Sequence, residues 1–236
     1  GQRRGLYSFL LVVLMVGVVI GGRFTAGNAS GSTLIVDISD EAVPLAGGLK
    51  VLNPTSPGTE AYSGGGATVD ASNSAEGYVT VSYTGNNKKV KLQIAKAGGT
   101  TYTYDLKRRG EYEVFALTGG DGAYQITVFE NITGTQYAQA LACRVNAKLK
   151  SPLLPFLYPS QYVNFNANSK TVAKGNELAQ GAGNDLEIVA NVYNYVIKTI
   201  SYDTDKARNV KSGYLPVIDE ILESKKGIRF DYDAAI

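Results

Sequence analysis

The side chains that could carry covalent chemistry are few. The chain contains one cysteine, Cys143, and no histidine. Hydrolysis or acyl transfer through a nucleophilic serine or cysteine needs a neighbouring base, and histidine is the usual one. The chain as given therefore cannot assemble a triad of this kind. A single cysteine also excludes an intrachain disulfide, and the sequence predicts neither a cofactor site nor a metal site.

Cys143 itself is expected to be structural. It lies two residues after Leu141 and two before Val145, where apolar and polar side chains alternate. Such alternation predicts a strand with one face in a core. We therefore interpret Cys143 as a small buried hydrophobic residue rather than as a reactive thiol.

A second candidate site lies near the end of the chain. There the run Gly227-Ile228-Arg229-Phe230-Asp231-Tyr232 follows a predicted helix at Val217–Leu222, and an earlier predicted helix ends in Ile200-Ser201-Tyr202. In this order the segments resemble the transglutaminase-like family, which has a papain-like core. Its members carry a helix, an I-x-Y step, an L-x-x-x-x-G approach and a G-x-C-x-D-[YF]-A helix start. The connector Leu154–Val163 is similar to the lead-in of exported Firmicutes-type members, so the resemblance covers residues 150–236.

The resemblance implies Cys-dependent acyl transfer or amide hydrolysis on proteins. In the family, a cysteine thiolate lies at the positive end of a helix dipole, and a histidine and an aspartate follow on later strands. Here Gly227, Asp231 and Tyr232 match the motif. In the family, the aspartate at the Asp231 position is structural rather than catalytic, unlike the aspartate on the later strand. Arg229 stands at the nucleophile position, and Asp233 stands where a small residue is expected. No catalytic residue is intact, so we expect a pseudoenzyme.

The ends of the chain suggest a piece of a longer protein. It starts at Gly1 rather than Met and ends at Ile236 in an apolar run without a helix stop signal. We therefore expect a chain truncated within the catalytic domain, with the family's histidine further on. Whether the parent protein is an enzyme stays open, and so does whether Arg229 is genuine.

The N-terminus carries an apolar segment. Residues 5–22 contain no charge and follow Arg3 and Arg4. Their length is on the border between a secretory signal core and a membrane span. The two arginines would stay in the cytoplasm by the positive-inside rule. Residues 1–23 are therefore predicted to be a signal or anchor segment, cleaved or retained, that places the rest on the extracellular face of the cell membrane or secretes it.

Residues 24–76 are rich in Gly, Ser, Thr, Asn and Pro. This composition predicts a spacer with short strands, one at Ser32–Ile38 and one near Leu49–Leu52. The alternative is a loose edge of the next domain.

Residues 77–150 have a period of two, broken by Gly- and Asn-rich turns. Short strands at this spacing predict an immunoglobulin-like β-sandwich. The six expected strand faces are Val79/Val81/Tyr83, Val90/Leu92/Ile94, Tyr102/Tyr104/Leu106, Tyr112/Val114/Ala116, Tyr124/Ile126/Val128 and Tyr137/Leu141/Cys143/Val145/Leu149.

Residues 151–236 are predicted to form helices after a proline-rich connector. We expect one helix at Ser169–Gln180, one that starts at the N-cap Asn184, and one at Leu215–Ser224 that stops at Gly227. The second should bury a stripe at spacings of three and four: Leu186, Val189, Ala190, Tyr193, Val196, Ile197 and Ile200. We expect the helix that begins near Phe230 to lack a packing partner.

The expected fold is therefore α+β: an N-terminal membrane segment, the sandwich, and the helical first part of a transglutaminase-like domain. The leading hypothesis is an extracellular transglutaminase-like protein that is catalytically incompetent in this chain. The alternative is a non-catalytic cell-surface binding or structural module whose Tyr-rich sheets contact wall polysaccharide or a protein. A net charge of +2 without a dense basic cluster argues against nucleic acid.

Overall fold

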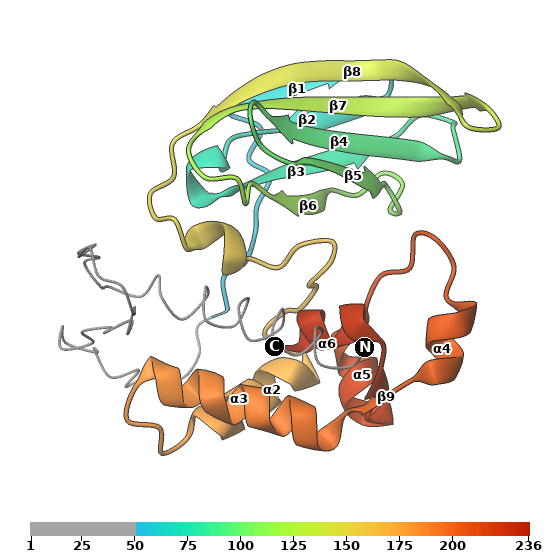
Figure 1. Cartoon of the computed structure of the whole chain (residues 1–236). Helices are drawn as coiled ribbons and strands as arrows, with labels where there is room; N and C mark the ends of the chain where they lie inside the picture. Colours follow the sequence, from blue (N-terminus) through green and yellow to red (C-terminus); the bar gives the residue numbers. More distant parts are fainter. Residues whose placement is uncertain (1–50) are drawn as a thin grey trace, which may run out of the picture.

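A computed structural model describes residues 51–236, which form a mixed α plus β chain (Figure 1). The predicted N-terminal segment, residues 1–23, and the predicted strand at Ser32–Ile38 lie outside the described residues. Within residues 51–236, none of the helices has the length and hydropathy needed to cross a membrane.

Two four-stranded antiparallel sheets make up residues 61–147, here called the two-sheet region. The first sheet has the order β1-β2-β3-β6 and the second the order β5-β4-β7-β8. The strands are β1 (Ala61–Gly64), β2 (Ala67–Asp70), β3 (Tyr78–Tyr83), β4 (Val90–Lys96), β5 (Thr101–Asp105), β6 (Glu113–Ala116), β7 (Gly122–Thr133) and β8 (Gln136–Ala147). All six strands predicted after residue 77 are therefore present.

One hydrophobic core lies between the two sheets. Val79, Val81 and Phe115 contribute to it from the first sheet, and Leu92 and Ile126 from the second; each is at most 1% exposed. These residues recur at every second position because successive side chains of a strand point to opposite faces. The alternation that predicted the strands thus also predicted most of this core.

Part of the predicted spacer belongs to the sheets. β1 and β2 pair with each other, and β2 pairs with β3. The segment before them is also held in place: Thr55 N–H donates to the Tyr78 hydroxyl, and the hydroxyls of Ser56 and Thr80 lie 2.7 Å apart. These polar contacts cover the outer face of β3, which explains why a Gly/Ser/Pro-rich composition does not make residues 53–70 a free linker.

The buried face of β6 differs from the predicted one. Glu113 and Phe115 are buried, whereas Val114 and Ala116 are only partly so. The Glu113 carboxylate accepts hydrogen bonds from the backbone N–H groups of Lys107 and Arg108 and from the Gln161 side chain. A buried carboxylate is tolerated when its oxygens are paired in this way. The prediction for this strand was wrong because it placed a charged residue in solvent by default.

The helices occupy residues 170–236, here called the helical region. They are α2 (Lys170–Ala179), α3 (Asp185–Thr199), α4 (Thr204–Asn209), α5 (Ile218–Ser224) and α6 (Arg229–Ala235), with a parallel pair of short strands, β9 (Ser201–Tyr202) and β10 (Lys226–Gly227). The predicted cap of α3 is confirmed, since the Asn184 side chain accepts from Glu187 N–H at 3.0 Å. α5 starts at Ile218 rather than Leu215 and ends at Ser224 as predicted, but the residue that stops the helix is Lys225, which adopts φ 53°, rather than Gly227.

The apolar stripe predicted for α3 was partly wrong. Leu186 and Ile197 are exposed, while Val196 and Ile200 are buried against Ile221 of α5. The prediction included too many residues in the buried stripe, because this helix has more apolar positions than the neighbouring elements cover. Tertiary packing selects among them.

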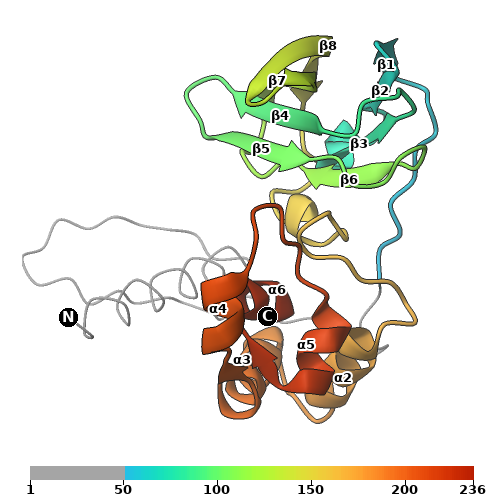
Figure 2. The same ribbon diagram turned by 90° about the vertical axis from the view of Figure 1, so that its right-hand side faces the viewer.

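The two regions meet through the connector that follows β8. α6 lies on the side of the helical region that faces the sheets, in both views (Figure 2). The ring of Tyr162, in the connector, packs edge-on against Phe230 of α6 at 5.3 Å between centroids. It also packs in a tilted arrangement against Tyr104 of the core, at 5.0 Å. The expectation that this helix lacks a partner was therefore wrong.

Cys143 occupies the predicted inward face of β8 and is 7% exposed. Burial raises the pKa of its thiol from 9.0 to about 11. At pH 8 only about one thiol in a thousand is then ionised. We predict that a disulfide reagent labels Cys143 far more slowly in the folded chain than in urea, and that the folded rate rises as the pH approaches 11. Equal folded and unfolded rates at pH 8 would contradict this placement.

Candidate functional site

The residues of the predicted site gather at the start of α6. Arg229 is the first residue of that helix and its side chain is exposed. Gly227 precedes it in β10 and is buried, and Asp231 and Tyr232 lie in the first turn. Their closeness follows from the sequence. Their contacts with more distant residues do not, and these contacts define the site.

Asp231 is the centre of a buried polar cluster and is 0% exposed. One carboxylate oxygen accepts from the Ile228 N–H at 2.9 Å and from the Lys206 ammonium at 2.7 Å. The other accepts from the Tyr214 hydroxyl at 2.7 Å. The lysine and tyrosine come from α4 and from the loop that follows it, so a single carboxylate joins three segments.

Lys206 stays protonated in this cluster. Burial lowers the pKa of its ammonium, but hydrogen bonds to Asp231 and Tyr214 outweigh burial and leave the pKa above its ordinary value. Burial, followed by the hydrogen bond to Asp231, raises the pKa of Tyr214. Neither side chain is poised to exchange a proton near neutral pH. The cluster is therefore suited to positioning rather than to general acid–base catalysis.

Gly227 and Tyr232 connect the same turn to β9. A Cβ atom at Gly227 would lie 2.8 Å from the Cβ of Asp231, so a larger residue cannot fit without displacing the helix. The Gly227 carbonyl accepts from Asp203 N–H at 2.9 Å, and the Tyr232 hydroxyl donates to the Ile200 carbonyl at 2.6 Å. The closing motif and the end of α3 are therefore in direct contact.

A shallow hollow of about 340 Å³ opens beside Arg229. Its lining is mostly apolar, with Tyr202, Ala207, Val210, Ile228 and Phe230, and its two charged members are Arg229 and Asp233. Arg229 forms no ion pair with the residues that the structure describes. An apolar surface with an available guanidinium can bind a ligand that carries a carboxylate.

The hollow lacks the usual nucleophiles of acyl transfer. Its lining contains neither a thiol nor an aliphatic hydroxyl, and the one cysteine lies in β8 of the two-sheet region. Between residues 51 and 236, no group of three or more acidic or thiol side chains is arranged to hold a metal ion. The features that this hollow offers a ligand are its apolar surface and the Arg229 guanidinium.

Sequence reasoning identified Arg229, Gly227, Asp231 and Tyr232 but missed Lys206 and Tyr214. These partners lie 25 and 17 residues before Asp231, a separation at which no local pattern predicts contact. The start of α4 did carry a signal, since Asp203 caps that helix by accepting from Lys206 N–H at 2.8 Å.

No protein-family model matches the chain, and no curated protein matches it. The family resemblance therefore rests on the residues quoted above.

Asp231 should matter far more to stability than its neighbour Asp233. Replacing Asp231 by Ala leaves the Lys206 ammonium, the Tyr214 hydroxyl and the Ile228 N–H without their acceptor, at a cost of about 2–4 kcal/mol. Asp233→Ala, an exposed change in the same helix, should stay within about 0.5 kcal/mol. Urea unfolding measures the loss in the free energy of unfolding of each variant. Equal losses for the two variants would contradict the role given to Asp231.

Proposed function

We propose that this chain is an extracellular, non-catalytic member of the transglutaminase-like group. Its two-sheet region would be the immunoglobulin-like sandwich, and its helical region the first part of a papain-like core. The proposal combines the family's motif order with the chemistry of the hollow beside Arg229. It assigns that hollow to ligand binding, without acyl transfer.

One observation carries the proposal. The segments on which the resemblance rests are far apart in the sequence, yet they contact one another: β9 pairs with β10, and Tyr232 bonds to Ile200. Segments that matched a family pattern only by chance would have no reason to assemble around one helix start. This assembly supports a common origin with the family's nucleophile-bearing turn.

Arg229 supports the non-catalytic part of the proposal. A cation at the first position of a helix opposes the helix dipole and costs about 0.3–1 kcal/mol, so helix formation does not explain it. A guanidinium also cannot act as a nucleophile, because it stays protonated. The residues given contain no histidine, so they do not by themselves supply the base that the family uses.

Location outside the cell is part of the proposal. It is supported by the uncharged stretch at residues 5–22 behind Arg3 and Arg4. Protease added to intact cells should cleave the two-sheet region, and full protection there, with cleavage after lysis, would overturn this orientation.

A non-catalytic surface-binding module without any family tie is the second candidate. The observation that favours it is a separate cavity in the two-sheet region, lined by tyrosine and threonine side chains.

We predict that neither the chain nor its Arg229→Cys variant catalyses acyl transfer. The substitution supplies a thiol at an exposed helix start, but no histidine exists to act as base or acid, a contribution worth about 10² to 10⁴ in rate. The assays are amine incorporation into a glutamine-donor protein and hydrolysis of an ester substrate of thiol proteases. As a control for accessibility, iodoacetamide should label the thiol introduced at position 229 quickly and label Cys143 slowly. Turnover by either protein that iodoacetamide abolishes would overturn the proposal.

A further inference from the structure

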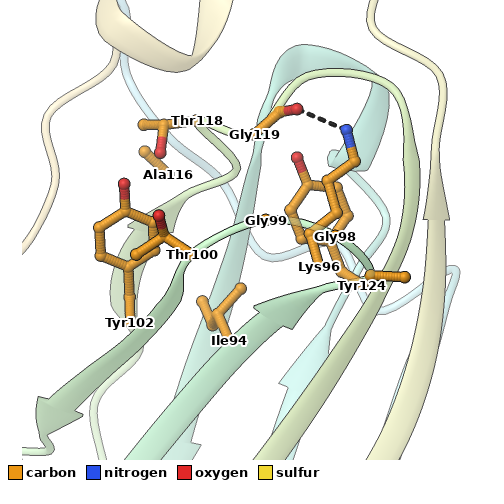
Figure 3. A pocket seen from close by; sticks show the side chains of 11 residues that line it. Ile94, Lys96, Gly98, Gly99, Thr100, Tyr102, Ala116, Thr118, Gly119 and Tyr124 are labelled. Carbon is orange, nitrogen blue, oxygen red and sulfur yellow. Dashed lines mark hydrogen bonds between the residues drawn. The ribbon is translucent and has the colours of Figure 1, made fainter.

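A second cavity, of about 360 Å³, lies at one end of the two-sheet region (Figure 3). It is bounded by the turn between β4 and β5, residues 97–100, and by the residues that follow β6, 118–119. It shares no residue with the hollow beside Arg229. Its volume is at the low end of the range found for ligand sites, about 300–1,000 Å³.

The walls of this cavity offer an aromatic ring to a ligand. Figure 3 shows Tyr102 on one side, Tyr124 on the other and Ile94 between them. Tyr124 and Ile94 are buried, whereas Tyr102 is 41% exposed. Tyr102 lies in stacked orientation on the buried ring of Tyr104, at 6.4 Å between centroids. The exposed ring therefore has a buried aromatic neighbour on its own strand and also lines the cavity.

The rim carries hydroxyl groups and a single charge. Thr100 and Thr118 are exposed there. The only charged lining residue is Lys96, whose ammonium donates to the Gly119 carbonyl at 2.5 Å and lies 5.9 Å from the centre of the Tyr124 ring. The charge is thus already held by a carbonyl and a ring, while its remaining N–H groups can still reach a ligand oxygen.

The absence of a side chain at Gly119 leaves room for the Lys96 and Tyr124 side chains. A Cβ atom there would lie 2.9 Å from Lys96 Cδ and 3.0 Å from the Tyr124 hydroxyl oxygen. Any other residue would push the lysine out of its position across the mouth. Gly98, on the opposite turn, has φ +72° with open space around it, so the turn is tight and leaves the entrance clear.

We propose that this cavity binds one ring of a neutral saccharide. A pyranose ring has a C–H face that packs on an aromatic side chain and a hydroxyl edge that bonds to threonine hydroxyls and to an ammonium. No carboxylate lines the cavity, and its one cation, Lys96, already donates to the Gly119 carbonyl, so the lining holds no unpaired cation that would select an acidic sugar over a neutral one. This inference does not depend on the proposal for the hollow beside Arg229. The two sites share no residue, so either proposal can be wrong without affecting the other.

The test measures saturation transfer by NMR from the full chain, kept in a detergent without a sugar headgroup, to five probes. Four are neutral, namely cellotetraose, xylotetraose, maltotetraose and tetra-N-acetylchitotetraose, and one is the anionic trigalacturonate. We expect at least one neutral probe to bind and to bind more tightly than the anionic one. Binding of no neutral probe, or preference for the anionic probe, overturns the proposal.

Two tyrosines of equal exposure provide a matched pair of variants. Tyr102→Ala removes the ring from the cavity and should raise the dissociation constant about tenfold, the loss that about 55 Å² of apolar contact represents. Tyr112 is also 41% exposed but does not line the cavity, so Tyr112→Ala should leave the constant unchanged. Equal effects of the two variants, or no effect of Tyr102→Ala, refute the site.

Thr118→Val provides a second readout in case Tyr102→Ala disturbs the fold. It removes one hydroxyl at nearly constant shape and should weaken binding about threefold. Slow labelling of Cys143 in each variant reports that the sheets are folded. Unchanged binding by a folded Thr118→Val chain contradicts the hydroxyl contacts.

Discussion

The buried carboxylate of Asp231 is the constraint on which the helical region depends. A carboxylate withdrawn from water is costly unless it is paired and hydrogen-bonded. Asp231 meets this requirement only when Lys206, Tyr214 and the Ile228 N–H are all in place. α6 has seven residues, too few for a helix to be stable alone. Its position therefore follows from the carboxylate and the packing around it, and the position of Arg229 follows from that of α6.

The same turn also determines how the two regions meet. Phe230, next to Asp231, packs edge-on against Tyr162 and, at 6.4 Å, against Tyr214. Tyr162 contacts Tyr104 in the core between the sheets, and the neighbouring Gln161 bonds to the buried Glu113. The helix start thus has packed neighbours on both sides, which makes the hollow beside Arg229 a preformed surface. A preformed surface suits binding, because less ordering is needed when the ligand arrives.

Local signals predicted much of this architecture, and long-range partners account for the rest. Alternation located the strands between residues 77 and 150 and the inward face of Cys143, and the Asn184–Glu187 pair located the start of α3. The face of β6 could not be predicted, because Glu113 is satisfied by Gln161, 48 residues away. The partners of Asp231 were missed for the same reason. The Gly-rich turns between these strands were predicted, but the cavity between two of them depends on how the two sheets pack.

The most direct test of the account is the coupling between Lys206 and Asp231. Asp231→Asn, Lys206→Met and the double variant form a thermodynamic cycle when each is unfolded in urea. If the carboxylate organises the helix start through this contact, the two losses should be non-additive by about 1–3 kcal/mol, in the range measured for residues in one buried network. Losses that add to within about 0.5 kcal/mol, as for independent sites, would contradict the account.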